Sequence, residues 1–152
     1  MTATTTRQHR TARLALADGV VFSGRAFRAR GRTVEAEVVF NTALTGYQES
    51  LTDPSYEGQI LVQTTPLIGN TGVNPHDTES RRVHVAGFVV HELARRHSNY
   101  RATGSLDDYL ADAGIPGIEG IDTRALTRHI RTRGAIAGVL TDDPEHSDAE
   151  LV

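Results

Sequence analysis

Residues 35–69, EAEVVFNTALTGYQESLTDPSYEGQILVQTTPLIG, hold a polar stretch between two segments that favour β-strands. The first segment, residues 35–44, alternates polar and apolar side chains and then becomes apolar, which is typical of a strand entering a core. The second segment, residues 59–69, is rich in β-branched side chains before it reaches Pro66. We therefore expect two strands that are joined through an ordered turn.

The polar stretch combines turn-forming residues with two of the four tyrosines of the chain. Asp53-Pro54 favours the start of a turn, because an Asp side chain accepts a hydrogen bond from the backbone two residues later. Tyr47 and Tyr56 can pin this turn on a core. Ser55 would then lie at its apex. The residues alone leave open whether Ser55 only forms the turn or also contacts a ligand, since loops on rigid scaffolds carry binding groups.

Further strands are predicted on both sides of this region. Residues 13–27 are typical of a hairpin, because Asp18-Gly19 between apolar segments is a strong turn signal. Residues 83–93 are apolar enough for a strand that is covered on both faces. Residues 135–140 suggest a last strand, and residues 70–82 suggest a long polar loop.

Two helices are predicted in the second half of the chain. Ser105 to Asp108 resembles a capping box, and Gly114 fits the C-terminal stop of that helix. A second helix should begin near Asp122 or Thr123 and end at Gly134. The apolar face expected for it consists of Ile121, Ala125, Leu126, His129 and Ile130.

The two ends of the chain carry different signals. Residues 1–11 are expected to form a disordered start before the first strand, with a transit peptide as the alternative. Ser147 to Glu150 is a Ser-x-x-Glu capping box, and only Leu151 and Val152 follow it. Two residues after a capping box are too few to nucleate a helix. We therefore expect the sequence to continue in a longer protein.

Composition excludes several classes of function. The 152 residues fit one domain, and 38% hydrophobic with 23% charged residues is typical of a globular protein. A net charge of −3 gives no general attraction to nucleic acid or anionic membranes. No apolar run approaches a membrane span and no signal peptide is evident, so the expected location is cytoplasmic. The chain has neither Cys nor Lys, which excludes a Cys nucleophile and Schiff-base chemistry within it.

Three other candidate sites have simpler explanations. A metal site is not expected, because no metal-ligand pattern connects the histidines His76, His84, His91 and His97. An anion site before a helix is conceivable, but a plain loop is favoured by the spacing of Gly114, Gly117 and Gly120. A solvated helix face and a docking surface for an acidic partner both remain open for the basic stripe of Arg124, Arg128 and Arg131.

Long ordered blocks of the sequence resemble one family. They are VVFNTALTGYQESLTDPSYEGQILVQTTPLIGNTGVN (38–74), ESRRVHVAGFVV (79–90) and GIEGIDTRALTRHIRTRGAIAGVL (117–140). These blocks resemble the N-terminal domain of the small subunit of glutamine-dependent carbamoyl-phosphate synthase, and the likeness extends from about Ala12 to Leu140. One departure is Leu67, where the family's pattern leads us to expect His. This departure affects local polar contacts rather than the fold.

The resemblance implies an α+β fold, a three-layer β/β/α swivelling domain over residues 12–141. Residues 142–152 would start a linker or helix towards a class I glutamine amidotransferase domain. That domain carries a Cys–His–Glu set that releases ammonia from glutamine. The large subunit of the heterodimer then uses ATP, a divalent metal and bicarbonate to make carbamoyl phosphate for arginine and pyrimidine biosynthesis. The expected partners are the large subunit, the chain's own amidotransferase domain and L-glutamine, without nucleic acid, membrane, metal or cofactor in this chain.

In this family the serine of the Asp-Pro-Ser-Tyr motif reaches the glutamine site of the second domain. Carried over, this residue is Ser55, whose hydrogen bond would be worth about 1 kcal/mol and would assist binding rather than drive chemistry. No catalytic residue is expected in these 152 residues, and the chain alone should be inactive. The alternatives are a free-standing paralogue that acts as a non-catalytic binding or regulatory module, and a small hydrolase that uses histidines and a metal.

Overall fold

A computed structural model describes residues 10–27, 33–43, 46–69, 83–94 and 105–143. The polar loop expected over 70–82 and the capping box at 147–150 lie outside these ranges. The same holds for residues 1–9 of the expected disordered start. Within the described part, strand β1 begins at Thr11, and the Arg10 carbonyl accepts a hydrogen bond from the Ala26 N–H at 2.7 Å.

Three strands form an antiparallel group. β1 (Thr11–Leu16) and β2 (Val21–Ala26) make the predicted hairpin, and β9 (Ile136–Thr141) pairs with the other edge of β1. The Asp18 side chain accepts a hydrogen bond from the Val20 N–H at 3.2 Å, and Gly19 adopts a φ of 98°. The Asp-Gly pair therefore closes the turn as its chemistry predicts.

Four strands form a parallel group, in the order β3 (Thr33–Asn41), β4 (Ile60–Gln63), β6 (Gly87–Val89) and β8 (Gly117–Glu119). β3 also pairs antiparallel with β9, and β8 pairs antiparallel with β2. The seven strands thus close into a barrel in the order β1-β2-β8-β6-β4-β3-β9. A separate two-stranded sheet consists of β5 (Leu67–Ile68) and β7 (Glu92–Leu93).

The parallel strands are covered on both faces by two apolar cores. The inner core takes side chains from one face of most of the seven strands, and the outer core takes side chains from the other face of the parallel strands and from two helices. β3 shows the alternation, because Val38 belongs to the inner core while Val39 packs against the outer core. Continuous burial of β4 and β6 is the pattern expected for parallel strands.

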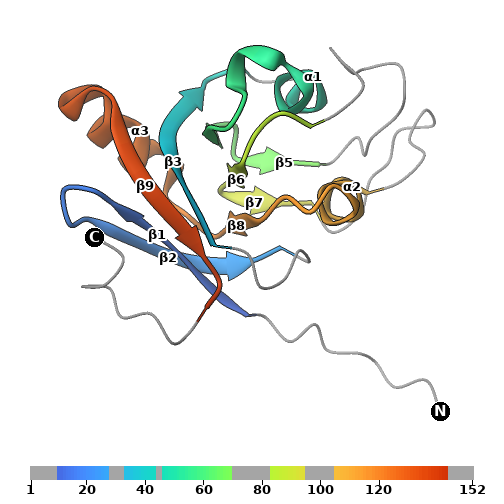
Figure 1. Ribbon diagram of the computed structural model, residues 1–152, viewed down its shortest axis with the longest axis horizontal. Coiled ribbons are helices and arrows are strands. Elements are labelled where there is room, and N and C mark those ends of the chain that lie inside the picture. The colour runs from blue at the N-terminus through green and yellow to red at the C-terminus, as the bar shows by residue number, and fades with distance from the viewer. Residues whose placement is uncertain (1–9, 28–32, 44–45, 70–82, 95–104, 144–152) are drawn as a thin grey trace.

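Helices complete the fold, and Figure 1 shows their arrangement. α1 (Tyr47–Thr52) and α2 (Leu106–Asp112) contribute to the outer core, whereas α3 (Thr123–Arg133) packs Leu126 and Ile130 into the inner core. In Figure 1 the antiparallel strands lie to the left and α1 and α2 to the right, with the parallel strands between them. These layers confirm the α+β class. No helix in the described ranges has the length and apolarity that crossing a membrane requires.

The predicted helix ends are confirmed. The Ser105 hydroxyl accepts a hydrogen bond from the Asp108 N–H at 3.1 Å, and Asp122 caps α3 by accepting from the Ala125 N–H at 3.0 Å. Gly114 follows α2 with a φ of 70°, and Gly134 follows α3 with a φ of 78°.

Other predictions on elements were wrong. The single strand expected over 83–93 is β6 followed by β7. The strand expected to begin at residue 59 and to end at Pro66 is confirmed as β4, but β5 after Pro66 was not predicted. The Gly-rich segment expected as a loop contains β8, which is buried throughout. In α3, Ala125 is exposed, and two threonines share the buried face with Leu126 and Ile130, namely Thr123 and Thr127.

The contact between Gly24 in β2 and β8 provides a test of the strand pairing. A Cβ at Gly24 would lie 2.2 Å from the carbonyl oxygen of Glu119, which cannot move without disturbing the pairing of β8 with β2. Gly24→Ala should therefore lower the free energy of unfolding in urea by roughly 1–3 kcal/mol. Ser23→Ala, at the exposed neighbouring position, is the matched control and should stay within about 0.5 kcal/mol of the parent. Equal unfolding midpoints for both variants would contradict this close approach.

Candidate functional site

The Ser55 turn, which we define as residues 53–58, is a short 3-10 helix with a capped start. Helix η1 (Pro54–Tyr56) has Pro54 at its first position, and the Asp53 carboxylate accepts a hydrogen bond from the Ser55 N–H at 2.9 Å. The Tyr56 N–H donates to the Asp53 carbonyl at 3.1 Å, and Gly58 leaves the turn with a φ of 70°. The predicted turn is therefore confirmed, and Ser55 is exposed on it.

The two tyrosines hold this region on the outer core. Tyr47 is only 7% exposed and lies in α1, while Tyr56 is half-buried and packs against the same core. Leu51, from the next turn of α1, is fully buried there. The region before the Ser55 turn is thus a packed helix, although its polar sequence predicted only a turn.

Asn41, at the end of β3, joins the strand to both α1 and the Ser55 turn. Its side-chain amide donates to the Ser50 hydroxyl at 3.1 Å and to the Tyr56 hydroxyl at 3.2 Å. Its side-chain oxygen accepts from the Ala43 N–H at 2.8 Å. Sequence reasoning missed this role. The one available signal was a polar amide directly after the apolar residues Val38–Phe40, where a strand was expected to continue.

The chain that follows β4 is tied to the chain that follows β3. The Gln63 side chain donates to the Ala43 carbonyl at 3.1 Å, and the Thr65 hydroxyl donates to the same carbonyl at 2.6 Å. The Thr64 N–H donates to the Asn41 carbonyl at 3.1 Å. Polar groups thus gather at the carboxyl ends of β3 and β4, where the chain leaves β3 towards α1, whereas the Ser55 turn leads into the amino end of β4.

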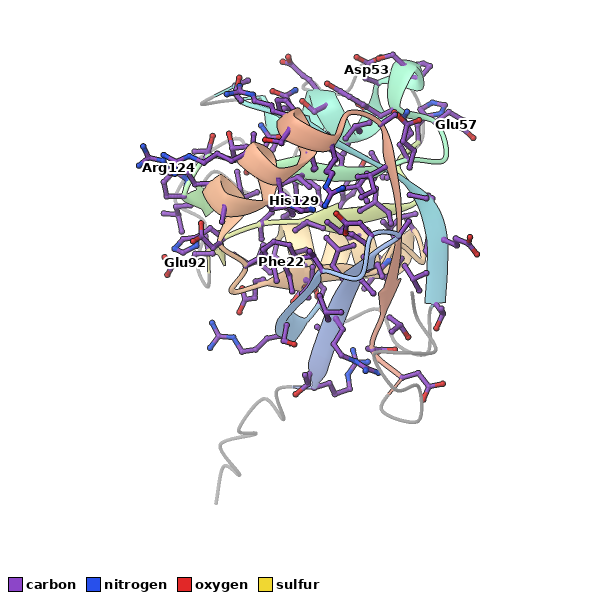
Figure 2. All side chains as sticks on the ribbon, turned by 90° about the vertical axis from the view of Figure 1, so that its left-hand side faces the viewer. Phe22, Asp53, Glu57, Glu92, Arg124 and His129 are labelled. Atoms are coloured by element: carbon purple, nitrogen blue, oxygen red, sulfur yellow. The ribbon has the colours of Figure 1, made fainter. Side chains whose placement is uncertain are left out.

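Charge around the Ser55 turn is unevenly distributed. Hydrogen bonds from the Ser55 backbone N–H and then from its side chain lower the pKa of Asp53, burial opposes this, and nearby His84 lowers the pKa further. Glu57 follows η1 and bonds Nδ1 of His84 through its carboxylate. Asp53 and Glu57 lie together at the top of Figure 2, well apart from Arg124 and Glu92 on the left.

This arrangement is suited to holding a polar ligand. The Ser55 side chain helps to lower the pKa of the Asp53 carboxylate, and a carboxylate whose pKa is lowered is a weak general base. The turn therefore gives Ser55 little activation as a nucleophile. It does present an exposed hydroxyl in a fixed position, which is what orienting a bound molecule requires.

Histidines and glycines singled out from the sequence have separate structural roles. His91 bonds the Ile121 carbonyl through Nδ1 at 3.0 Å, whereas His84 bonds Glu57. His76 and His97 lie outside the described ranges, and within those ranges no three His, Asp or Glu residues are grouped as metal ligands would be. Gly117 makes room for the ring of Phe27, since a Cβ there would lie 2.2 Å from it.

The basic stripe and the departure at Leu67 both lie on the surface. Arg124 and Arg128 are exposed, while the Arg131 guanidinium lies 5.1 Å from the ring centroid of Phe40. Docking of a partner on this stripe stays a prediction. Leu67 is 40% exposed in β5, so an aliphatic side chain there leaves both cores unchanged.

Asn41 should be decisive for the local order of the turn. Asn41→Ala removes both bonds donated by its amide, and we expect a loss of about 1–3 kcal/mol in the free energy of unfolding. Amide hydrogen exchange of residues 53–58 should accelerate more than exchange in β1. Tyr56→Phe removes only one of these bonds and should cost about 0.5–1.5 kcal/mol. If amide hydrogen exchange of residues 53–58 is the same in Asn41→Ala as in the parent, Asn41 does not anchor the turn.

The titration of Asp53 should report the capped turn. Because the folded pKa is below the ordinary value of 3.8, the stabilisation by this carboxylate is present above that value and is lost as pH falls through the lower folded pKa. An NMR titration of the Asp53 carboxyl carbon should give a midpoint below 3.8. Ser55→Ala keeps the backbone bond and should move the midpoint only part of the way back. A parent midpoint at 3.8 or above would rule out the cap.

Comparison with known proteins places the chain in a family. The family model described as "Carbamoyl-phosphate synthase small chain, CPSase domain" matches residues 14–140. The carbamoyl phosphate synthase small chain of Syntrophotalea carbinolica is 60% identical over 135 residues, which are 87% of this chain and 36% of that protein. The small chain of Streptomyces coelicolor is 58% identical over 137 residues, which are 90% of this chain and 36% of that protein.

Similarity among solved structures is weaker. An aminopeptidase from Aneurinibacillus sp. strain AM-1 has a TM-score of 0.49 and 20% identity, covering 86% of this chain and 30% of that one. A likeness at this level assigns neither fold nor activity. The sequence relatives are far more specific, and the chain spans 36% of the length of the two named above. The chain belongs to the carbamoyl-phosphate synthase small chain family, and it corresponds to the CPSase domain of that family.

Proposed function

We propose that this chain is the N-terminal domain of the small subunit of glutamine-hydrolysing carbamoyl-phosphate synthase, and that it lends Ser55 to the glutamine site of a following amidotransferase domain. The observation that carries the role of Ser55 is its exposed position on a turn bonded to β3 through Asn41. The family membership supports the rest. As its finer fold we propose the β/β/α swivelling domain, which the order of antiparallel strands, parallel strands and helices supports.

In this proposal the 152 residues act as a scaffold and as a docking surface for the large subunit, in the cytoplasm. They contain no Cys, so the thiolate that attacks the glutamine amide belongs to the amidotransferase domain. The released ammonia passes to the large subunit, which uses ATP, bicarbonate and a divalent metal to make carbamoyl phosphate for arginine and pyrimidine biosynthesis. The exposed Arg124 and Arg128 are candidates for the docking contact.

The geometry of the turn defines what Ser55 would do for glutamine. A hydroxyl has one donor and two acceptor sites. The Ser55 side chain is one of the groups that lower the pKa of Asp53, so in this proposal its proton points to that carboxylate and its lone pairs accept a hydrogen bond from a ligand N–H. Glutamine offers such donors in its ammonium group and in its side-chain amide. Ser55 would therefore position the substrate, and it would not form a covalent bond to it.

Replacement of Ser55 tests the proposal in the full-length small subunit assembled with its large subunit. Loss of one neutral hydrogen bond should raise KM for glutamine about two- to tenfold and change kcat much less. Ser23→Ala, an exposed serine in β2, is the matched control and should leave KM unchanged. The proposed role of Ser55 is refuted if Ser55→Ala and Ser23→Ala give the same KM for glutamine.

A further inference from the structure

The backbone of His84 bonds the chain on both sides of the Ser55 turn. Its N–H donates to the carbonyl of Leu51 in α1 at 2.9 Å, and its carbonyl accepts from the Gly58 N–H at 3.0 Å. Leu51 precedes the turn and Gly58 ends it. One residue from the segment before β6 therefore fixes the distance between the two ends of the turn.

The imidazole of His84 faces the same turn. Nδ1 bonds the Glu57 carboxylate, and the His84 side chain is only 11% exposed, whereas that of Glu57 is 53% exposed. Asp53, at the other end of η1, also lies within the electrostatic influence of this imidazole. The ring thus interacts with Asp53 and Glu57, the two acidic residues on either side of η1, the helix that contains Ser55 (both are labelled in Figure 2).

The backbone at His84 has its own support. Val83 and Val85, on either side, are buried in the outer core with exposures of 9% and 2%. These side chains hold the segment against the core whatever residue stands between them. Replacement of the imidazole is therefore expected to leave the packing of Val83 and Val85 in place.

We propose that His84 is a positioning residue that sets the orientation of the Ser55 hydroxyl, by holding Glu57 through its imidazole and Leu51 and Gly58 through its backbone. A 3-10 helix of three residues is too short to keep one geometry without external contacts. Asn41 supplies contacts from β3, and His84 supplies contacts from the segment before β6. This inference rests on the proposed role of Ser55 in binding glutamine, because His84 would act on the substrate only through that hydroxyl.

The test uses the full-length small subunit assembled with its large subunit, and measures kcat and KM for glutamine. His84→Ala should raise KM about two- to tenfold, the effect of one lost hydrogen bond, with kcat changed less than about twofold. His84→Asn places an amide donor near the position of Nδ1 and should restore most of the affinity for glutamine. Glu57→Ala, at an exposed residue that carries little packing, should reproduce the KM of His84→Ala.

The matched control is the second described histidine–carboxylate pair, between His129 of α3 and Asp18 of the β1–β2 turn, at 2.5 Å. His129→Ala breaks this pair in another part of the chain and should leave KM for glutamine unchanged. Thermal unfolding of each variant shows whether it is folded. If His84→Ala does not fold, the KM of Glu57→Ala decides: a raised value supports the inference, and an unchanged value overturns it.

A double variant separates this inference from the proposed function. If His84 acts through Ser55, His84→Ala combined with Ser55→Ala should have the KM of Ser55→Ala alone. Multiplied effects in the double variant would overturn the inference while the role of Ser55 stands. The same conclusion follows if Ser55→Ala raises KM and His84→Ala does not. An unchanged KM in Ser55→Ala would instead refute the proposed function itself, and the inference with it.

Discussion

The pairing of β3 with strands on both of its edges determines where the other elements lie. One edge pairs antiparallel with β9, with Val38 opposite Ile136, and the other pairs parallel with β4, with Asn41 beside Gln63. β3 joins the parallel strands to the antiparallel strands, so its register fixes how both groups are aligned. A shift by one residue would exchange Val38 and Val39 between the two cores and turn the Asn41 amide away from Ser50 and Tyr56. The position of Ser55 is therefore a consequence of strand register.

Order in the Ser55 turn depends on contacts that come from elsewhere in the chain. α1 has six residues and η1 has three, lengths at which neither helix is stable in isolation. Fixing the backbone of each residue costs roughly 1–2 kcal/mol. Burial of Tyr47 and Leu51 in the outer core and the bonds of Asn41 offset this cost during folding. A ligand that met Ser55 would then have little chain left to order, which favours its binding.

Local signals in the sequence predicted the features that depend on neighbouring residues. The Asp18-Gly19 hairpin, the Ser105 and Asp122 caps and the Asp53-capped turn all follow from side chains close to the backbone they bond. Features that depend on distant residues were missed. α1 starts at Tyr47 after the N-cap residue Gly46, which has no side chain to cap it, and β8 is a three-residue strand that exists only through its pairing with β2 and β6. The roles of Asn41 and His84 likewise require knowing which segments meet in space.

The proposed function requires the Ser55 turn to attract the N–H groups of a ligand, and the negative charges found there are consistent with this requirement. Asp53 and Glu57 are acidic residues on the two sides of η1, and Asp53, whose pKa lies below its ordinary value, is ionised at neutral pH. A carboxylate of a ligand approaching Ser55 would meet repulsion, whereas an ammonium or amide N–H would find an acceptor. Screening by salt confines this preference to within about 8 Å, so it acts only on groups that have nearly reached the hydroxyl. The Ser55 turn would therefore favour the nitrogen-bearing groups of glutamine over its carboxylate.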